Sequence, residues 1–168
     1  MQLIHGPGSN ATVRKQASQA LHAIIEHNTD EKQSRREGRI LNLIEQLLEY
    51  CEDEHYSTVE NPAAALCTLM KFSFDVEQRH TMCQFGALYA LAKVIQVEHV
   101  RKNHDLRNLS SNEINIRRYA AMSLTNLTCG DSTNKALLCS MESFMFALVA
   151  QLQSPIEELC QVRFISSF

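Results

Sequence analysis

The sequence has no tryptophan, only 3 prolines and 5 glycines, and aromatic residues make up 7% of its 168 positions. An all-β fold needs many tight turns, and so few turn-forming residues argue against one. The scarcity of large rings predicts helices that pack through aliphatic side chains. Since 45% of the residues are hydrophobic, the chain has enough apolar surface for a core, and its length is that of about one domain.

Long apolar runs and a strong excess of one charge are also absent. The sequence has no run of ~18 apolar residues, so we expect no membrane span. Its first residues lack a basic start followed by an apolar run, which predicts no secretory signal. The net charge of −3 gives no bulk attraction to nucleic acid. Two isolated basic pairs, Arg35-Arg36 and Arg117-Arg118, are flanked by acids and do not form a nucleic-acid track.

The six cysteines are scattered, and none forms a Cys-x-x-Cys pair. Without a secretory signal, we expect reduced structural thiols. Cys51 and His55 have the spacing of a metal pair on a helix, but no second pair accompanies them, and we interpret them as solvent-facing loop residues. Arg79 and His80 near Cys83 are interpreted as a surface cluster. We therefore expect no metal, no cofactor and no catalytic residue, and the sequence predicts a protein that is not an enzyme.

The clearest pattern that is present is a helix over Asn115–Cys129. Its apolar side chains recur at helical spacing and line one face, at Ile116, Ala120, Leu124 and Leu127. Gly130 suits the left-handed end of this helix, and Asp131 suits the start of the next. Asn126 lies off the apolar face, and its amide has the donors and the acceptor that could hold the backbone of an extended peptide.

This helical unit recurs along the chain. Leu124–Thr128 aligns with Leu69–Ser73 and with Leu21–Ile25, and a small residue precedes each copy at the matching place. Ala23, Lys71 and Asn126 are then equivalent positions. They lie farther apart than the roughly 40–47 residues of a HEAT or armadillo unit, and we expect loops to make up the difference.

The repeats divide the chain into units and insertions. We expect residues 1–10 to be the tail of a preceding repeat and a loop, residues 51–61 an acidic loop insertion, residues 98–114 a polar loop insertion and residues 154–168 the truncated start of a further repeat. The three repeat units are predicted at residues 11–50, 62–97 and 115–153. Helices are expected over Ala11–Asn28, Arg39–Tyr50, Ala63–Phe74, Asp75–Gln84, Ala87–Val97, Asn115–Cys129, Ser132–Ser140 and Phe144–Gln153, with Asp30–Arg36 as a short helix or a turn.

Several stretches resemble armadillo repeats, and more specifically the armadillo domain of the adenomatous polyposis coli (APC) family. They are Ala17–Glu37, Leu66–Met82 and, above all, Arg117–Met141 followed by Ala147–Ser154. The resemblance implies an all-α fold, namely an armadillo-repeat α-solenoid that forms a right-handed superhelix and is incomplete at both ends. The tail Arg163–Phe168 departs from the family's long helix at this place.

The resemblance also implies a function. Proteins of this family are negative regulators of Wnt signalling and tumour suppressors that promote β-catenin destruction, and they link to microtubules and adherens junctions. We therefore expect a cytoplasmic, protein-binding scaffold module associated with the cytoskeleton or with junctions, which joins the β-catenin complex through the full-length protein. The alternatives are a cytoskeletal or junctional adaptor without a Wnt role, and a nonfunctional truncated fragment.

Stacked long helices create a concave face on which extended peptides bind. We expect a peptide groove formed by Lys71, Arg118, Tyr119, Met122 and Asn126. Asn126 would hold the peptide backbone, and Lys71 and Arg118 would attract acidic side chains. In the family, this groove captures segments of adaptor and exchange-factor proteins. The alternative is structural: Asn126 would cap a neighbouring backbone group, and Lys71 would simply be solvated.

The ends of the chain carry apolar residues without obvious partners in the sequence. They include Leu3 and Ile4 at one end, and Phe164 and Ile165 at the other. Because a repeat buries its apolar face only against its neighbours, we expect marginal stability of the isolated chain.

Overall fold

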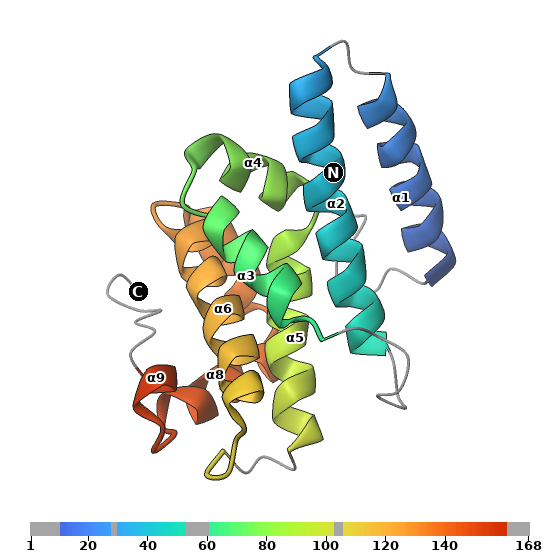
Figure 1. Ribbon diagram of the computed structural model, residues 1–168. Coiled ribbons are helices and arrows are strands. Elements are labelled where there is room, and N and C mark those ends of the chain that lie inside the picture. The colour runs from blue at the N-terminus through green and yellow to red at the C-terminus, as the bar shows by residue number, and fades with distance from the viewer. Residues whose placement is uncertain (1–10, 28–29, 53–60, 103–105, 161–168) are drawn as a thin grey trace.

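The computed structural model describes residues 11–27, 30–52, 61–102 and 106–160 (Figure 1). All regular secondary structure within these ranges is helical, which confirms the predicted all-α class. The helices are α1 (Ala11–Glu26), α2 (Glu31–Glu52), α3 (Ala63–Phe72), α4 (Val76–Gln84), α5 (Ala87–Arg101), α6 (Ser111–Thr128), α7 (Ser132–Cys139), α8 (Glu142–Leu152) and α9 (Glu157–Cys160). The predicted features at residues 1–10, at His55 and at Arg163–Phe168 lie outside the described residues.

Helix α5 lies at the centre of the packing and contacts α2, α4, α6, α7 and α8. Helices α3 and α6 lie side by side, and α2 packs against both α3 and α5 (Figure 1). Helix α1 forms the outer edge and packs mainly on α2. The arrangement therefore exposes one face of the α3–α6 pair.

The core is aliphatic, as the shortage of aromatic residues predicts. Its fully buried side chains include Ile44 on α2, Leu66 and Leu69 on α3, Ile95 on α5 and Leu124 on α6. Burying each such side chain contributes about 1.5–3 kcal/mol. The small residues Ala120 and Ala121 are also completely buried on α6, which lets α6 approach its neighbours α3 and α5 closely.

Helix α2 is continuous, which corrects the predicted break between Asp30–Arg36 and Arg39–Tyr50. Asp30 begins the helix, because its Oδ1 atom accepts hydrogen bonds from the backbone N–H groups of Lys32 and Gln33. Glycine at position 38, inside the helix, is less favourable than alanine by only about 1 kcal/mol. The strong helix formers around it offset that difference. The charged stretch is therefore the first half of α2.

The insertion predicted at residues 98–114 is partly helical, and this too is a correction. Helix α5 continues to Arg101, and both Glu98 and His99 are buried. Helix α6 already begins at Ser111, because Ser110 and Glu113 form a capping box. The predicted loop at residues 51–61 is likewise shorter at its start, since α2 runs through Glu52.

The predicted helix ends at residues 129–131 are confirmed. Gly130 has a φ of 74°, in the left-handed region. The side chain of Asp131 accepts a hydrogen bond from the backbone N–H of Asn134 and caps α7. The helix predicted over Ala63–Phe74 ends two residues earlier in the structure. The observed α3 stops at Phe72, and Ser73 caps it.

Helix α1 rests on α2 through both apolar and polar contacts. Leu21 and Ile25 are buried, whereas the rest of the seam consists of charged and hydroxyl groups. On α1, Arg14 forms an ion pair with Glu52 of α2. Glu45 of α2 accepts a hydrogen bond from Ser18 of α1, and it lies 3.2 Å from the Nε2 atom of His22 on the same helix as Ser18.

No single helix in the described ranges is long and apolar enough to cross a membrane. Helices α7 and α8 together meet that criterion of length and composition, but they are bent by 94° at the break between them.

Candidate functional site: the α3–α6 face

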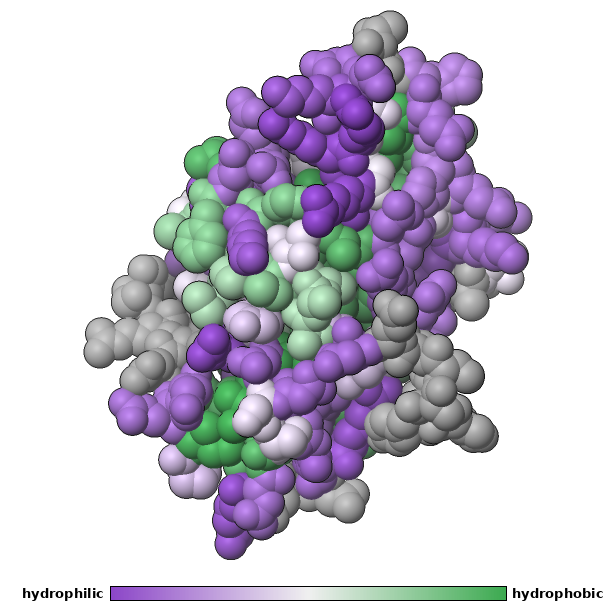
Figure 2. Space-filling model, in the orientation of Figure 1, coloured by the Kyte–Doolittle hydropathy of each residue, from purple (hydrophilic) through white to green (hydrophobic). Residues whose placement is uncertain are grey.

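Helices α3 and α6 run parallel and in register, and hydrogen bonds join their two ends. Near their starts, Asn61 Nδ2 donates to Asn112 Oδ1 over 2.7 Å. Near their ends, Asn126 Nδ2 donates to Ser73 Oγ over 2.8 Å. Figure 2 shows moderately hydrophobic residues over α3 and the adjoining part of α6, next to hydrophilic residues of α1 and α2. We call this surface the α3–α6 face.

The amide of Asn126 has a defined orientation. The Ser73 hydroxyl donates its hydrogen to the carbonyl oxygen of Met70 over 2.7 Å, so its oxygen can only accept from Asn126 Nδ2. Asn126 Oδ1 therefore points away from Ser73, and it forms no hydrogen bond within the described residues. A half-buried amide keeps one acceptor and one N–H available for a further partner.

The other predicted groove residues lie on the same two helices. Lys71 is exposed in the last turn of α3. Met122 and Tyr119 are half-buried and pack against the hydrophobic core. The Arg118 guanidinium lies 5.4 Å from the centre of the Tyr119 ring, a distance typical of a cation–π contact.

The predicted groove residues therefore lie in two groups on a pair of packed helices. Lys71 and Asn126 lie near the joined ends of α3 and α6, since Ser73 lies only two residues beyond Lys71. Arg118 and Tyr119 lie about 12 Å earlier along α6, at 1.5 Å per residue. An extended peptide of about four residues spans that distance. Ala23 is exposed on α1, which packs on α2.

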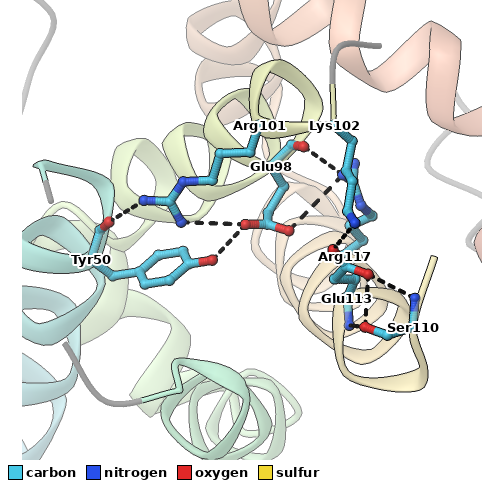
Figure 3. Close-up of polar contacts among 7 residues, drawn as sticks. All are labelled: Tyr50, Glu98, Arg101, Lys102, Ser110, Glu113 and Arg117. Atoms are coloured by element: carbon cyan, nitrogen blue, oxygen red, sulfur yellow. Dashed lines mark hydrogen bonds and ion pairs between the residues drawn. The ribbon is translucent and has the colours of Figure 1, made fainter. Parts of the chain in front are cut away.

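A buried polar cluster that the sequence did not predict holds α6 in place (Figure 3). Glu98 on α5 is its centre. Its Oε1 atom accepts from the Tyr50 hydroxyl over 2.5 Å and from Arg101 Nη1 over 3.4 Å. Arg117 Nη2 on α6 donates to the Glu98 carbonyl oxygen over 2.6 Å and lies 4.0 Å from its Oε2 atom. The cluster thus ties the ends of α2 and α5 to the first half of α6.

Arg101 makes two further contacts with α2. Its Nη2 atom donates to the backbone carbonyl oxygen of Tyr50 over 2.8 Å, and its guanidinium lies 4.2 Å from the Tyr50 ring centre. Burial raises the pKa of the Tyr50 hydroxyl, and the Glu98 carboxylate raises it further. Burial lowers the pKa of Arg117, with Glu98 opposing the shift. The hydroxyl therefore stays protonated and donates to Glu98.

The capping box beside this cluster adds an ion pair. Lys102 Nζ lies 2.6 Å from Glu113 Oε1, and Glu113 Oε2 accepts from the backbone N–H and the hydroxyl of Ser110, each over 2.7 Å (Figure 3). Burial raises the pKa of Glu113, but the hydrogen bonds from Lys102 and Ser110 outweigh it and leave the pKa below its usual value. The first turn of α6 is therefore fixed from two sides.

The two arginines at residues 117 and 118 have different environments. Arg117 is completely buried in the polar cluster, whereas Arg118 is half-buried over Tyr119 on the α3–α6 face. The sequence shows only a basic pair. The helical spacing of Glu98 and Arg101 is the one local signal that could have indicated the cluster, because residues three apart face each other on a helix.

Cys51 lies at the end of α2 and is half-buried, which corrects its predicted place in a solvent-facing loop. Neither this thiol nor that of Cys83 is activated. Burial raises the pKa of Cys51 to about 12, although Arg101 and Lys93 partly oppose it. Burial also raises the pKa of Cys83, and Asn134 Nδ2 lies 3.3 Å from its sulfur atom. Within the described ranges, no three His, Cys, Asp or Glu residues are placed to hold a metal ion.

Comparisons with known proteins address the repeats directly. Residues 27–82 match the adenomatous polyposis coli (APC) repeat. The chain is 42% identical to the adenomatous polyposis coli protein of Homo sapiens over 190 residues, which cover 96% of this chain and 7% of that protein. It is 38% identical to the human adenomatous polyposis coli protein 2 over 89% of this chain and 7% of the relative.

A further relative matches a shorter part of the chain. The adenomatous polyposis coli protein-related protein 1 of Caenorhabditis elegans is 37% identical over 86 residues, which cover 51% of this chain and 7% of that protein. This chain is thus similar to APC proteins over nearly all of its length, and it spans about 7% of the length of the curated relatives that it matches.

Proposed function

We propose that this chain is an armadillo-type scaffold module that binds extended peptide segments of partner proteins along the α3–α6 face. In this proposal α1, α3 and α6 occupy equivalent positions in successive repeats. The parallel, in-register packing of α3 and α6 supports the proposal, since such packing is expected of neighbouring repeats in a solenoid.

The observation that carries the proposal is the oriented amide of Asn126. Its Nδ2 atom is held by Ser73, and its Oδ1 atom and second N–H are left for a ligand. A peptide backbone offers an N–H and a carbonyl oxygen at a matching separation. Because the amide is already oriented, binding costs little side-chain entropy. Met122 and Tyr119 would supply apolar contacts, and Lys71 and Arg118 would pair with acidic side chains.

We also propose the biological setting that the similarity to APC proteins suggests. In this proposal the module serves a cytoplasmic negative regulator of Wnt signalling, within a complex that promotes β-catenin destruction, and its partners are adaptor and exchange-factor proteins. It acts by binding and not by catalysis. A cytoskeletal or junctional adaptor without a Wnt role would use the same face with different partners.

A peptide-binding assay tests the face directly. The probe is a library of fluorescent, unphosphorylated 12-residue peptides, and the chain is compared with Asn126→Ala and Lys71→Glu. We expect each substitution to weaken the best binders about tenfold, the effect of losing one or two hydrogen bonds to a ligand.

Two matched variants separate binding from folding. Ser73→Ala also removes the hydrogen bond between α3 and α6 but keeps the Asn126 amide, and Lys15→Glu makes the same charge change on α1. Ser73→Ala should weaken binding less than Asn126→Ala does, because the amide remains but is no longer held in one orientation, and Lys15→Glu should bind like the original chain. Unchanged binding by Asn126→Ala and Lys71→Glu would mean that peptides use another surface, and no binding by any peptide would refute the proposed function.

A further inference from the structure

The first half of α2 carries a basic ridge, which we define as Lys32, Arg35, Arg36 and Arg39. All four side chains are exposed. Their spacing of three, four and seven residues from Lys32 places them on one face of the helix. Figure 2 shows hydrophilic side chains over this half of α2, beside the paler area over α3. The ridge is a local concentration of positive charge in a chain whose net charge is −3.

The ridge adjoins the end of the α3–α6 face. The Arg39 guanidinium lies 5.6 Å from the ring centre of Phe72, the last residue of α3. Lys71 precedes Phe72 and is exposed. The Asp75 carboxylate has a lowered pKa, chiefly because of a backbone hydrogen bond from Gln78 and also because of nearby Arg36. A peptide leaving the face beyond Asn126 and Lys71 would therefore meet Arg36 and Arg39.

Most of this positive charge is not neutralised by the protein itself. Within the described ranges, Lys32, Arg39 and Lys71 form no ion pair, and the contact of Arg35 with Glu31 is 3.8 Å long between largely exposed side chains. Such a surface pair is worth ~0–1 kcal/mol.

The neighbouring carboxylates are used locally. Asp30 caps the start of α2 through backbone N–H groups. Glu37 accepts a hydrogen bond from Gln33 Nε2 over 2.8 Å. A cleft of about 770 Å³ lies between α2 and α4, and charged residues of both signs line it, among them Lys32, Arg36, Glu37 and Glu77. Lys32 and Arg36 therefore belong both to the ridge and to the cleft, whereas Arg35 and Arg39 of the ridge lie outside its lining.

We propose that the basic ridge binds a phosphoserine or phosphothreonine of the peptide whose neighbouring residues occupy the α3–α6 face. The inference rests on the proposed function and adds the chemistry of the ligand. A phosphate carries nearly two negative charges and three acceptor oxygens, and arginine pairs with it through two parallel hydrogen bonds. Arg36 and Arg39 lie one turn apart, so both can reach one phosphate.

The dimensions favour a phosphopeptide over a nucleic acid or a membrane. From Lys32 to Arg39 the ridge covers about 10 Å at 1.5 Å per residue. A nucleic-acid track pairs with a succession of phosphates over a longer distance, and the net charge of −3 disfavours broad contact with any polyanion. The apolar α3–α6 face beside the ridge suits the side chains that flank a phosphorylated residue.

The test uses two peptide libraries that differ in one group. Both contain 12-residue peptides with a fixed serine near one end, which is phosphorylated in the first library and unmodified in the second. We expect phosphorylation to strengthen binding to the chain about tenfold. Arg36→Glu and Arg39→Glu should abolish this gain while leaving the binding of unmodified peptides unchanged, whereas Lys15→Glu on α1 should preserve it.

Two milder variants, Arg36→Gln and Arg39→Gln, keep the test valid if a charge reversal disturbs the fold. Equal binding of both libraries, or a gain that survives in all ridge variants, would overturn the inference while leaving the proposed function intact. Loss of binding to a 20-nucleotide RNA or to phosphatidylserine vesicles in the ridge variants, with no phosphate-dependent gain in peptide binding, would also overturn it. Failure of both libraries to bind would instead remove the proposed function itself.

Discussion

Arg117 on α6 donates a hydrogen bond of 2.6 Å to the backbone carbonyl oxygen of Glu98 on α5. Glu98 lies in the last turn of α5, where carbonyl groups lack partners within the helix. A completely buried guanidinium therefore closes one helix and positions the next. The side-chain carboxylate of Glu98 accepts from the Tyr50 hydroxyl on α2, so three helices meet at one residue.

Replacing Arg117 by methionine should destabilise the fold strongly. The substitution keeps much of the side-chain volume but removes the donor to the Glu98 carbonyl oxygen and one of the two cations beside the buried Glu98 carboxylate, the other being Arg101. Breaking a buried pair in this way costs about 3 kcal/mol or more. The free energy of unfolding in urea measures the effect. Arg118→Met is the matched control, and we expect it to cost less than about 1 kcal/mol, since its guanidinium lies over the Tyr119 ring. Equal costs for both would contradict the described role of Arg117.

Removing the cap of α6 should have a smaller and local effect. Ser110 accepts from the backbone N–H of Glu113 and donates to its carboxylate. Ser110→Ala is expected to cost about 1 kcal/mol. Ser111→Ala changes the neighbouring residue, which takes no part in the capping box, and should be nearly neutral. Urea titrations of the two variants compare them directly, and a neutral Ser110→Ala would argue against the cap.

The ion pair between Glu113 and Lys102 should make stability depend on pH. The pKa of Glu113 is lower in the folded chain than in the unfolded chain. Its contribution is therefore complete above the unfolded value, about 4.3 for glutamate, and is lost as the pH falls through the folded value. The difference in stability between the original chain and Glu113→Gln should shrink between pH 6 and pH 3. A difference that stays constant over that range would show that the carboxylate charge contributes nothing.

The cysteines should react at very different rates. Because the pKa of Cys51 is raised to about 12, almost none of this thiol is ionised at pH 8. Cys129 and Cys139 are exposed. Alkylation by iodoacetamide, followed by mass spectrometry, should modify Cys129 and Cys139 about a hundredfold faster than Cys51. Full unfolding in urea should remove the difference, and rapid labelling of Cys51 in the folded chain would contradict its described burial.

The sequence predicted those elements whose signals are local. Apolar periodicity and cap residues gave the positions of the helices and the turn at Gly130. The break predicted before Arg39 was wrong, because a single glycine is a weak interruption among strong helix formers. The loop predicted from Glu98 was wrong because a polar residue was taken as solvent-exposed. Its partner Tyr50 is 48 positions away, and no local pattern identifies such a contact.

For the candidate site, the sequence predicted which helices carry the residues but not the contacts between them. The repeat alignment predicted that Lys71 and Asn126 occupy equivalent places on two helices, and the structure puts them near the joined ends of α3 and α6. Ser73 as the partner of Asn126 was not predicted, since the alternative considered for Asn126 was a backbone group. The orientation of the amide depends on this tertiary hydrogen bond, and sequence alone cannot give it.

The contacts between α1 and α2 include exposed polar pairs, and in this they differ from the buried aliphatic contacts around α5. The contact of Arg14 with Glu52 involves partly exposed side chains, so salt screens it. Local openings begin where few apolar contacts resist them. Amide protons of α1 should therefore exchange with deuterated solvent well before those of α5. Raising the ionic strength should therefore speed amide exchange in α1 while leaving the exchange of α5 nearly unchanged.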